Sequence, residues 1–253
     1  MLVLALDTTT RMGSVALARD GRVIASFAGD AAITHGERLP GDLMRVLETH
    51  GLHVSDIDLF AVAAGPGSFT GLRIGIATMQ GLALANGKPL AGISSLDAIH
   101  EAVSSQPSAL SPLNEVAVWM DAQRGQVFSA VYRDDVVIEP ALVEKPGEIL
   151  ARWARAGLRT SVFAGDGART YQDLIRAADP AARIVEPLPL LAPSIALLAE
   201  AHVRQHGPSS PDAIRAIYVR QTDAEITRDR KADLKVRTTA NSSSTATRSS
   251  ADP

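Results

Sequence analysis

The same order of predicted secondary-structure elements occurs twice along the chain. Each half contains three strands followed by helix, strand, helix, strand and helix, assigned from apolar runs and from apolar residues spaced three and four apart. The first half has predicted strands at 2–7, 14–19, 22–28, 57–64 and 89–93 and predicted helices at 37–50, 70–86 and 95–103. The second half has predicted strands at 115–121, 126–133, 136–143, 161–164 and 183–185 and predicted helices at 146–156, 170–178 and 193–206. This repeat predicts a duplicated α/β fold whose two lobes face one another across a cleft.

The two halves also begin alike. The first strand of each ends in an aspartate, Asp7 or Asp121, and a short turn then reaches a glycine, Gly13 or Gly125, that opens the second strand. A repeated turn of this kind strengthens the case for duplication.

The lobes are expected to divide in the segment 104–114, which is rich in serine, contains two prolines and has no periodicity. We expect one lobe at 1–103 and the other at 104–220, with the last helix of the second lobe packing back on the first. In the remainder, 221–253, no residue is aromatic, and nine of the thirteen positions 238–250 are Ser or Thr. Such a tail cannot offset about 1–2 kcal/mol of ordering per residue, so we expect it to be disordered.

The absence of cysteine and the net charge exclude several classes of function. The chain has no cysteine, which excludes disulfides, thiolate zinc sites, cysteine-bound iron–sulfur clusters and a cysteine nucleophile. The net charge is −3, and the tail carries six basic and five acidic residues, which leaves −4 for residues 1–220. A stand-alone nucleic-acid binder relies on Lys and Arg contacts to phosphate, so any contact of this chain with a nucleic acid is expected to be indirect.

The sequence gives no sign of membrane insertion. The opening apolar run ends at Asp7 after six residues and has no basic flank, and no run of about 18 apolar residues occurs. We therefore expect a cytoplasmic protein.

The aspartate turns suggest a nucleotide site. The hydroxyls of Thr8, Thr9 and Thr10 and backbone N–H groups could face a phosphate while Asp7 and Asp121 bracket a hydrated Mg²⁺. Gly165 completes this candidate set for ATP in a degenerate cleft. The alternative is that Asp and Thr simply form the turns. No lysine supports the phosphate interpretation.

The most specific segment runs from Gly65 to Gly75 and reads GPGSFTGLRIG. Glycines allow close backbone approach, and Ser68 is a candidate helix N-cap. The segment is neither a P-loop nor the dinucleotide fingerprint, because it lacks the required lysine and glycine spacing. It is either a packing turn or an anion site at a helix N-terminus.

This string, together with Leu6-Asp7-Thr8-Thr9, His35-Gly36-Glu37, Gly92-Ile93-Ser94-Ser95-Leu96 and Tyr218-Val219-Arg220, closely resembles the TsaB (YeaZ) family. The segment 121–127 also resembles that family's second aspartate turn, and the resemblance spans about residues 1–220. It implies an actin-like fold of the ASKHA, or ribonuclease H-like, type.

The resemblance further implies a role in forming N6-threonylcarbamoyladenosine in tRNAs that read codons starting with A. In that family TsaB is a partner and not the catalyst. It binds the related, metal-containing TsaD subunit, which transfers the threonylcarbamoyl group from its adenylate, and the complex also recruits the ATPase TsaE.

The histidines fit a non-catalytic role. A metal-dependent relative would carry two helical histidines four apart, and the corresponding place here offers His35 followed by Leu39. His202 and His206 have that spacing at the end of the last helix, where a solvated helix end is the favoured interpretation. His100 is expected to be structural. We therefore predict no metal site.

The resemblance places the partner interface on the first two helices. The candidate interface residues are His35, Leu39, Leu43, Phe69, Leu72, Arg73, Ile76 and Met79. Small residues in the second helix would permit close helix–helix approach, and the same surface could form a homodimer when TsaD is absent. The alternative is that this apolar stripe packs only on its own sheet.

Two other functions stay open at this level. An actin-like ATP-dependent kinase or ATPase would use Asp7 and Asp121. A glycopeptidase-like hydrolase has no identifiable nucleophile or metal set among these residues, which makes it the weakest of the three hypotheses.

Overall fold

The computed structural model describes residues 1–105 and 115–219. The first half contains β1 (Leu2–Asp7), β2 (Ser14–Arg19), β3 (Arg22–Ala28), α1 (His35–Glu48), β4 (Leu59–Gly65), α2 (Phe69–Ala85), β5 (Leu90–Ser94) and α3 (Ser95–Ser104). The second half contains β6 (Glu115–Asp121), β7 (Val127–Arg133), β8 (Val136–Glu144), α4 (Pro146–Ala156), β9 (Val162–Ala164), α5 (Asp166–Thr170), α6 (Gln172–Ala178), β10 (Arg183–Ile184) and α7 (Leu191–His206).

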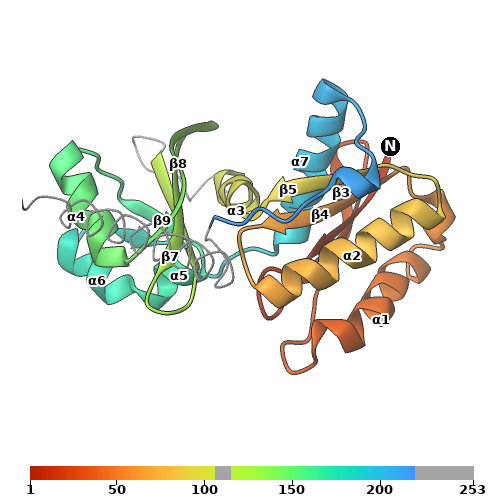
Figure 1. Ribbon diagram of the computed structural model, residues 1–253, viewed down its shortest axis with the longest axis horizontal. Helices are drawn as coiled ribbons and strands as arrows, with labels where there is room; N and C mark the ends of the chain where they lie inside the picture. The colour runs from red at the N-terminus through yellow and green to blue at the C-terminus, as the bar shows by residue number, and fades with distance from the viewer. Residues whose placement is uncertain (106–114, 220–253) are drawn as a thin grey trace, which may run out of the picture. The chain divides into compact units, whose positions relative to one another are not determined.

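Each half has its own five-stranded sheet. The strand orders are β3-β2-β1-β4-β5 and β10-β9-β6-β7-β8 (Figure 1). In both sheets three antiparallel strands are followed by strands that join in parallel, with helices in the connections, as parallel pairing requires. The predicted duplicated α/β fold is confirmed.

The helix predicted over 170–178 is present as α6, which begins at Gln172, and a separate short helix, α5, precedes it and was not predicted. Helix α5 begins directly after Gly165, which has a φ of +108° and lies so close to the Trp119 carbonyl that a side chain could not fit. The chain can therefore turn directly from β9 into α5.

Apolar residues fill a core on each sheet. In the first half, α1 and α2 bury Leu39, Leu47, Ile76 and Met79 against strand residues such as Phe60. In the second half, Trp153 of α4 packs on Trp119 of β6 and Phe163 of β9. A third cluster joins both halves through α3 and α7.

The helix α7 follows the second sheet in sequence but lies against strands of the first sheet. The Ala192 N–H donates a hydrogen bond of 3.0 Å to Ser14 Oγ, and the Gly21 N–H donates one of 2.8 Å to the buried Glu200 carboxylate. The first turn and the middle of α7 are thereby tied to the hairpin of β2 and β3.

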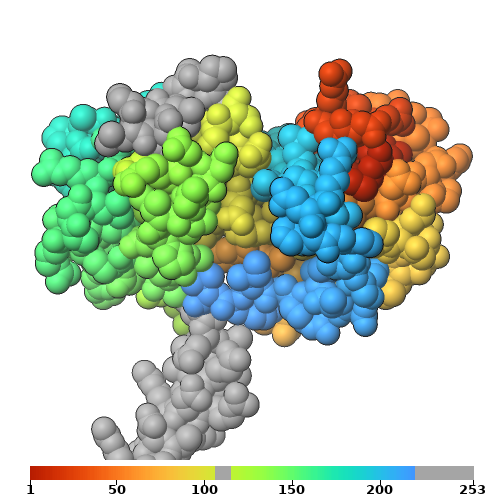
Figure 2. All heavy atoms as spheres, turned by 90° about the horizontal axis from the view of Figure 1, so that it is seen from above, coloured from red at the N-terminus to blue at the C-terminus, as the bar shows by residue number. Residues whose placement is uncertain are grey.

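After α7 the chain returns along the surface of the first half, where it is drawn in deep blue in Figure 2. The Gln80 amide on α2 donates to the carbonyls of Pro211 (2.8 Å) and Ile214 (3.2 Å). The Ile217 N–H donates to the Ala64 carbonyl at 2.7 Å. This C-terminal segment, residues 207–219, therefore fastens to α2 and to the end of β4.

The tail predicted at 221–253 and nearly all of the segment predicted to divide the lobes lie outside the described residues. Among residues 1–105 and 115–219, no helix has both the length and the apolar character needed to cross a bilayer.

Candidate functional site

The first aspartate turn is closed by its own residues. Asp7, at the end of β1, is only 2% exposed. Its Oδ1 accepts hydrogen bonds from the Thr9 N–H (2.8 Å) and from the Thr9 hydroxyl (2.6 Å). Burial raises the pKa of the Asp7 carboxyl above its ordinary value, against the opposing effect of the Thr9 bonds.

The glycine-rich segment packs on this turn. The Thr8 hydroxyl donates a hydrogen bond of 2.8 Å to the Gly71 carbonyl. A Cβ at Gly71 would overlap the Thr8 carbonyl oxygen, and one at Gly75 would overlap the Thr8 hydroxyl. The glycines are therefore required for close approach of α2 to β1, which favours the packing interpretation of this segment.

Helix α2 begins as predicted. The Ser68 hydroxyl accepts a hydrogen bond of 3.2 Å from the Gly71 N–H, and the Ser68 N–H donates to the Thr9 carbonyl at 3.0 Å. Ser68 is thus confirmed as the N-cap, and it joins the helix to the aspartate turn.

The second aspartate turn is built similarly. Asp121 Oδ1 accepts a hydrogen bond of 2.8 Å from the Gln123 N–H, and the Asp121 N–H donates one of 3.0 Å to Asp166 Oδ1. Burial raises the pKa of the Asp166 carboxyl, and the negative charge of Asp121 adds to that effect. Gly165 lies directly before Asp166, where it provides the close approach to β6 described above.

These contacts test whether Mg²⁺–ATP fits the first turn. The hydroxyl of Thr8 and both the hydroxyl and the N–H of Thr9 already donate within the chain, and Asp7 accepts two of those bonds. These three donors are therefore used within the turn, which favours the turn interpretation of Thr8 and Thr9 over a phosphate clamp.

A buried arginine supports the same turn from α1. Arg38, 8% exposed, donates to the Met12 carbonyl and to His35 Nδ1 (2.8 Å for the latter) and forms an ion pair with Asp42. His35 Nε2 lies 2.9 Å from the Thr10 carbonyl. Because Arg38 can only donate, Nδ1 of His35 must accept, and Nε2 carries the proton that is donated to Thr10.

Arg38, Asp42 and Asp166 were not among the residues predicted from the sequence. The spacing of Arg38 and Asp42, four apart on α1, was the available signal for the first two. Asp166 could be found only with the correct start of α5. His35 occupies the place where a metal ligand was considered, and its ring nitrogens instead bind Thr10 and Arg38.

The predicted interface residues separate into two groups. Five have buried side chains: Leu39, Leu43, Ile76 and Met79 belong to the core cluster of the first half, and Leu72 is 1% exposed. These five therefore follow the alternative in which the apolar stripe packs within its own half. Phe69 and Arg73 are exposed, and the Arg73 guanidinium lies 4.2 Å from the centre of the Phe69 ring. Tyr218 of the C-terminal segment packs beside Phe69 at a centroid distance of 5.7 Å.

The exposed line of α2 consists instead of Arg73, Ala77, Gly81 and Leu84. Leu84 is 60% exposed, and Met44 on the neighbouring α1 is 46% exposed. This set of five residues, called the α1–α2 outer face below, combines two small residues, Ala77 and Gly81, with two exposed large apolar ones, Leu84 and Met44, and has one cation, Arg73, at its end.

The remaining histidines lie where the sequence placed them. His202 and His206 stack on one another at the exposed end of α7, and His100 is buried on α3. Across the described part of the chain, no three His, Cys, Asp or Glu side chains are grouped as metal ligands would be.

Comparison with known proteins identifies the family of this chain. The family model described as TsaD, tRNA N6-adenosine threonylcarbamoyltransferase, matches residues 29–182. The chain is 34% identical over 169 residues to the tRNA threonylcarbamoyladenosine biosynthesis protein TsaB of Escherichia coli K12, which covers 62% of this chain and 71% of that protein. It is 29% identical to TsaB of Bacillus subtilis 168 over 153 residues, 60% of this chain and 64% of that protein.

Solved structures with a similar fold include members of the same family. YeaZ from Pseudomonas aeruginosa superposes with a TM-score of 0.70 at 26% identity and covers 86% of this chain and 99% of its own. The activator of 2-hydroxyisocaproyl-CoA dehydratase from Clostridium difficile, at a TM-score of 0.50, 13% identity and 86% of this chain against 100% of its own, shares the fold alone. The fold is the duplicated actin-like one. On these matches, the chain belongs to the TsaB (YeaZ) family of tRNA threonylcarbamoyladenosine biosynthesis proteins.

Proposed function

We propose that this chain is a non-catalytic partner subunit in tRNA threonylcarbamoyladenosine formation. It binds and activates a TsaD-like transferase, together with a TsaE-like protein, in the cytoplasm. The observation that carries the proposal is the contrast between the aspartate turn, whose Thr8 and Thr9 donors are used internally, and the α1–α2 outer face, which is exposed in the described part of the chain.

The outer face has the properties of a helix-packing surface. Ala77 and Gly81 are four residues apart, so they form a shallow ridge along α2. Small side chains allow a partner helix to approach to the short end of the usual distance of about 8–10 Å. Leu84 and Met44 supply exposed apolar area at its border. A TsaD-like helix is therefore a suitable occupant, and a second copy of this chain would use the same face when the partner is absent.

The engagement of His35 supports the non-catalytic part of the proposal. Both of its ring nitrogens are used within the chain, one toward Thr10 and one toward Arg38. The residue therefore serves the first turn, and the Thr8 and Thr9 hydroxyls likewise have partners within the chain.

The test is reconstitution with TsaD, TsaE, threonylcarbamoyl adenylate and tRNA, with and without this chain. We expect modified nucleoside only, or at a much higher rate, when the chain is present. An equal yield without it would refute the proposal.

A charge on the outer face probes the interface. Ala77→Arg places a long cation at the ridge and is expected to weaken TsaD binding by about tenfold or more, because an unpaired charge is costly at the centre of an interface. Ala154→Arg, an exposed alanine on α4, is the matched control and should bind normally. Normal binding by both variants would move the interface elsewhere.

A further inference from the structure

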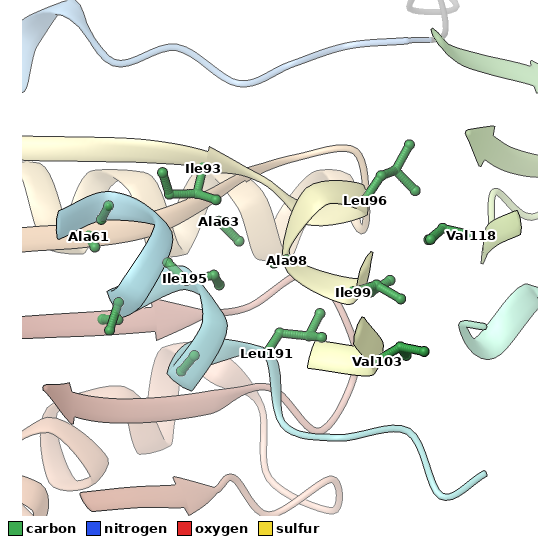
Figure 3. Packing of buried hydrophobic residues seen from close by; sticks show 14 of the residues in the cluster. Ala61, Ala63, Ile93, Leu96, Ala98, Ile99, Val103, Val118, Leu191 and Ile195 are labelled. Atoms are coloured by element: carbon green, nitrogen blue, oxygen red, sulfur yellow. The ribbon is translucent and has the colours of Figure 1, made fainter. Parts of the chain in front are cut away.

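Helix α3 packs on both sheets at once. In Figure 3, the side chains of Leu96, Ile99 and Val103 point toward Val118 on β6, while Ala98 lies on the side of the first sheet. All of these residues belong to the cluster that joins the halves. Relative placement of the two halves therefore depends on what holds β6 and β7 against α3.

One buried aromatic pair spans this junction. His100 on α3 is 6% exposed and Tyr132 on β7 is 3% exposed. Their rings are stacked, with centroids 4.2 Å apart and an interplanar angle of 7°. The Tyr132 hydroxyl donates a hydrogen bond of 2.6 Å to Asp97 Oδ1, one turn before His100 on the same helix.

The imidazole has polar partners from both sides. Ser104 Oγ lies 3.3 Å from its Nδ1, and Asp135 Oδ1, in the turn between β7 and β8, lies 3.7 Å from its Nε2. The ring also hydrogen-bonds the backbone of Asp134 in that turn. The contact therefore fixes the β7–β8 hairpin to α3 through a stack and through polar bonds.

The charged groups around the ring and its burial act on the pKa of His100 in opposite directions. Glu101 and Asp97 on α3, and Asp135 on the second half, favour the imidazolium, whereas burial disfavours it and is the largest effect. The Tyr132 hydroxyl faces Asp97 and stays protonated, because burial and that carboxylate raise its pKa. The net direction for His100 is a pKa below its ordinary value of about 6.5.

We infer that the His100–Tyr132 stack is an acid-sensitive latch between the two halves: the neutral imidazole holds the β7–β8 hairpin on α3, and protonation loosens that contact. The direction of this pH dependence follows from the linkage between proton binding and folding. A base whose pKa is depressed in the folded state contributes its full stability above about pH 6.5 and loses it as the pH falls through the folded-state pKa.

The absence of cysteine makes the latch measurable. Ala85→Cys on α2 and Ala154→Cys on α4 place spin labels on exposed helices of different halves. We expect the distance distribution between the labels in the full chain to broaden as the pH falls from 7.5 to 5. His100→Phe preserves a stacking ring without a titrating group, so its distribution should stay unchanged.

A proton NMR titration of His100 in the otherwise unmodified chain gives an answer that does not depend on that variant folding. A His100 pKa below 6.5 together with broadening in the same pH range supports the latch. A pKa at or above 6.5, or the same broadening in His100→Phe, overturns it. Tyr132→Phe keeps the stack and removes only the bond to Asp97, so it should retain the pH response from a looser starting distribution.

Discussion

The side-chain hydroxyl of Thr8 donates a hydrogen bond of 2.8 Å to the backbone carbonyl of Gly71. This bond joins the first aspartate turn to the first turn of α2, the helix that presents the outer face. The family string from Gly65 to Gly75 is thereby explained by packing: its glycines let α2 lie directly on Thr8 and Thr9. The turn, the helix start and the outer face are one structural unit.

Gly71→Ala tests this close approach. The added methyl group would overlap the Thr8 carbonyl oxygen, which is backbone and cannot move aside cheaply. We expect a loss of about 1–3 kcal/mol in the free energy of unfolding, measured by urea denaturation. Gly81→Ala, in the same helix with nothing within 4 Å of the new Cβ, is the matched control and should stabilise by about 0.5–1 kcal/mol. Equal effects of the two substitutions would contradict the packing role.

Gln80→Ala tests how the C-terminal segment is attached. The Gln80 amide donates to two carbonyls, those of Pro211 and Ile214, so its removal leaves both without this donor. We expect a loss of about 1–2 kcal/mol in unfolding free energy and faster amide exchange at Ile217. Gln205→Ala on the exposed end of α7 should do neither. Unchanged exchange at Ile217 in Gln80→Ala would show that the other contacts hold the segment unaided.

The order of the helices and strands could be predicted from the sequence, and the glycine-rich segment could be recognised there, because both are local patterns. The inward direction of Leu72, Ile76 and Met79 could not, because α2 carries apolar or small residues on nearly every side. The start of α5 was missed because it depends on the contact between Gly165 and Trp119, which are far apart in sequence. The Arg38–His35 arrangement likewise forms only when α1 meets the turn after β1.

Asp7→Asn addresses the charge buried in the first turn. A carboxyl whose folded-state pKa is raised binds its proton more readily in the folded than in the unfolded chain, so folding becomes less favourable as the pH rises through that interval. Asparagine can accept the same two bonds from Thr9 without a charge. We expect Asp7→Asn to be more stable than the parent chain at pH 7, with the difference vanishing below about pH 4. A less stable variant at pH 7 would show that the ionised carboxylate is favourable in this turn.

His35→Gln tests how the neutral imidazole contributes to the stability of the first turn. Burial and the nearby Arg38 charge lower the pKa of its imidazole, while the bond to the Thr10 carbonyl opposes them. Protonation at Nδ1 would also set two donors, the ring and Arg38, against one another. The neutral ring therefore stabilises the fold above about pH 6.5, and that contribution is lost as the pH falls through the folded-state pKa of His35.

Urea denaturation between pH 7.5 and 5 should show a smaller loss of stability for His35→Gln than for the parent chain. The control His50→Gln, at an exposed histidine, should behave like the parent. Because burial lowers the pKa of His100 as well, His35→Gln combined with His100→Phe should flatten the profile further. A profile for His35→Gln as steep as the parent's would mean that the imidazole stays neutral throughout or that its protonation leaves the turn intact.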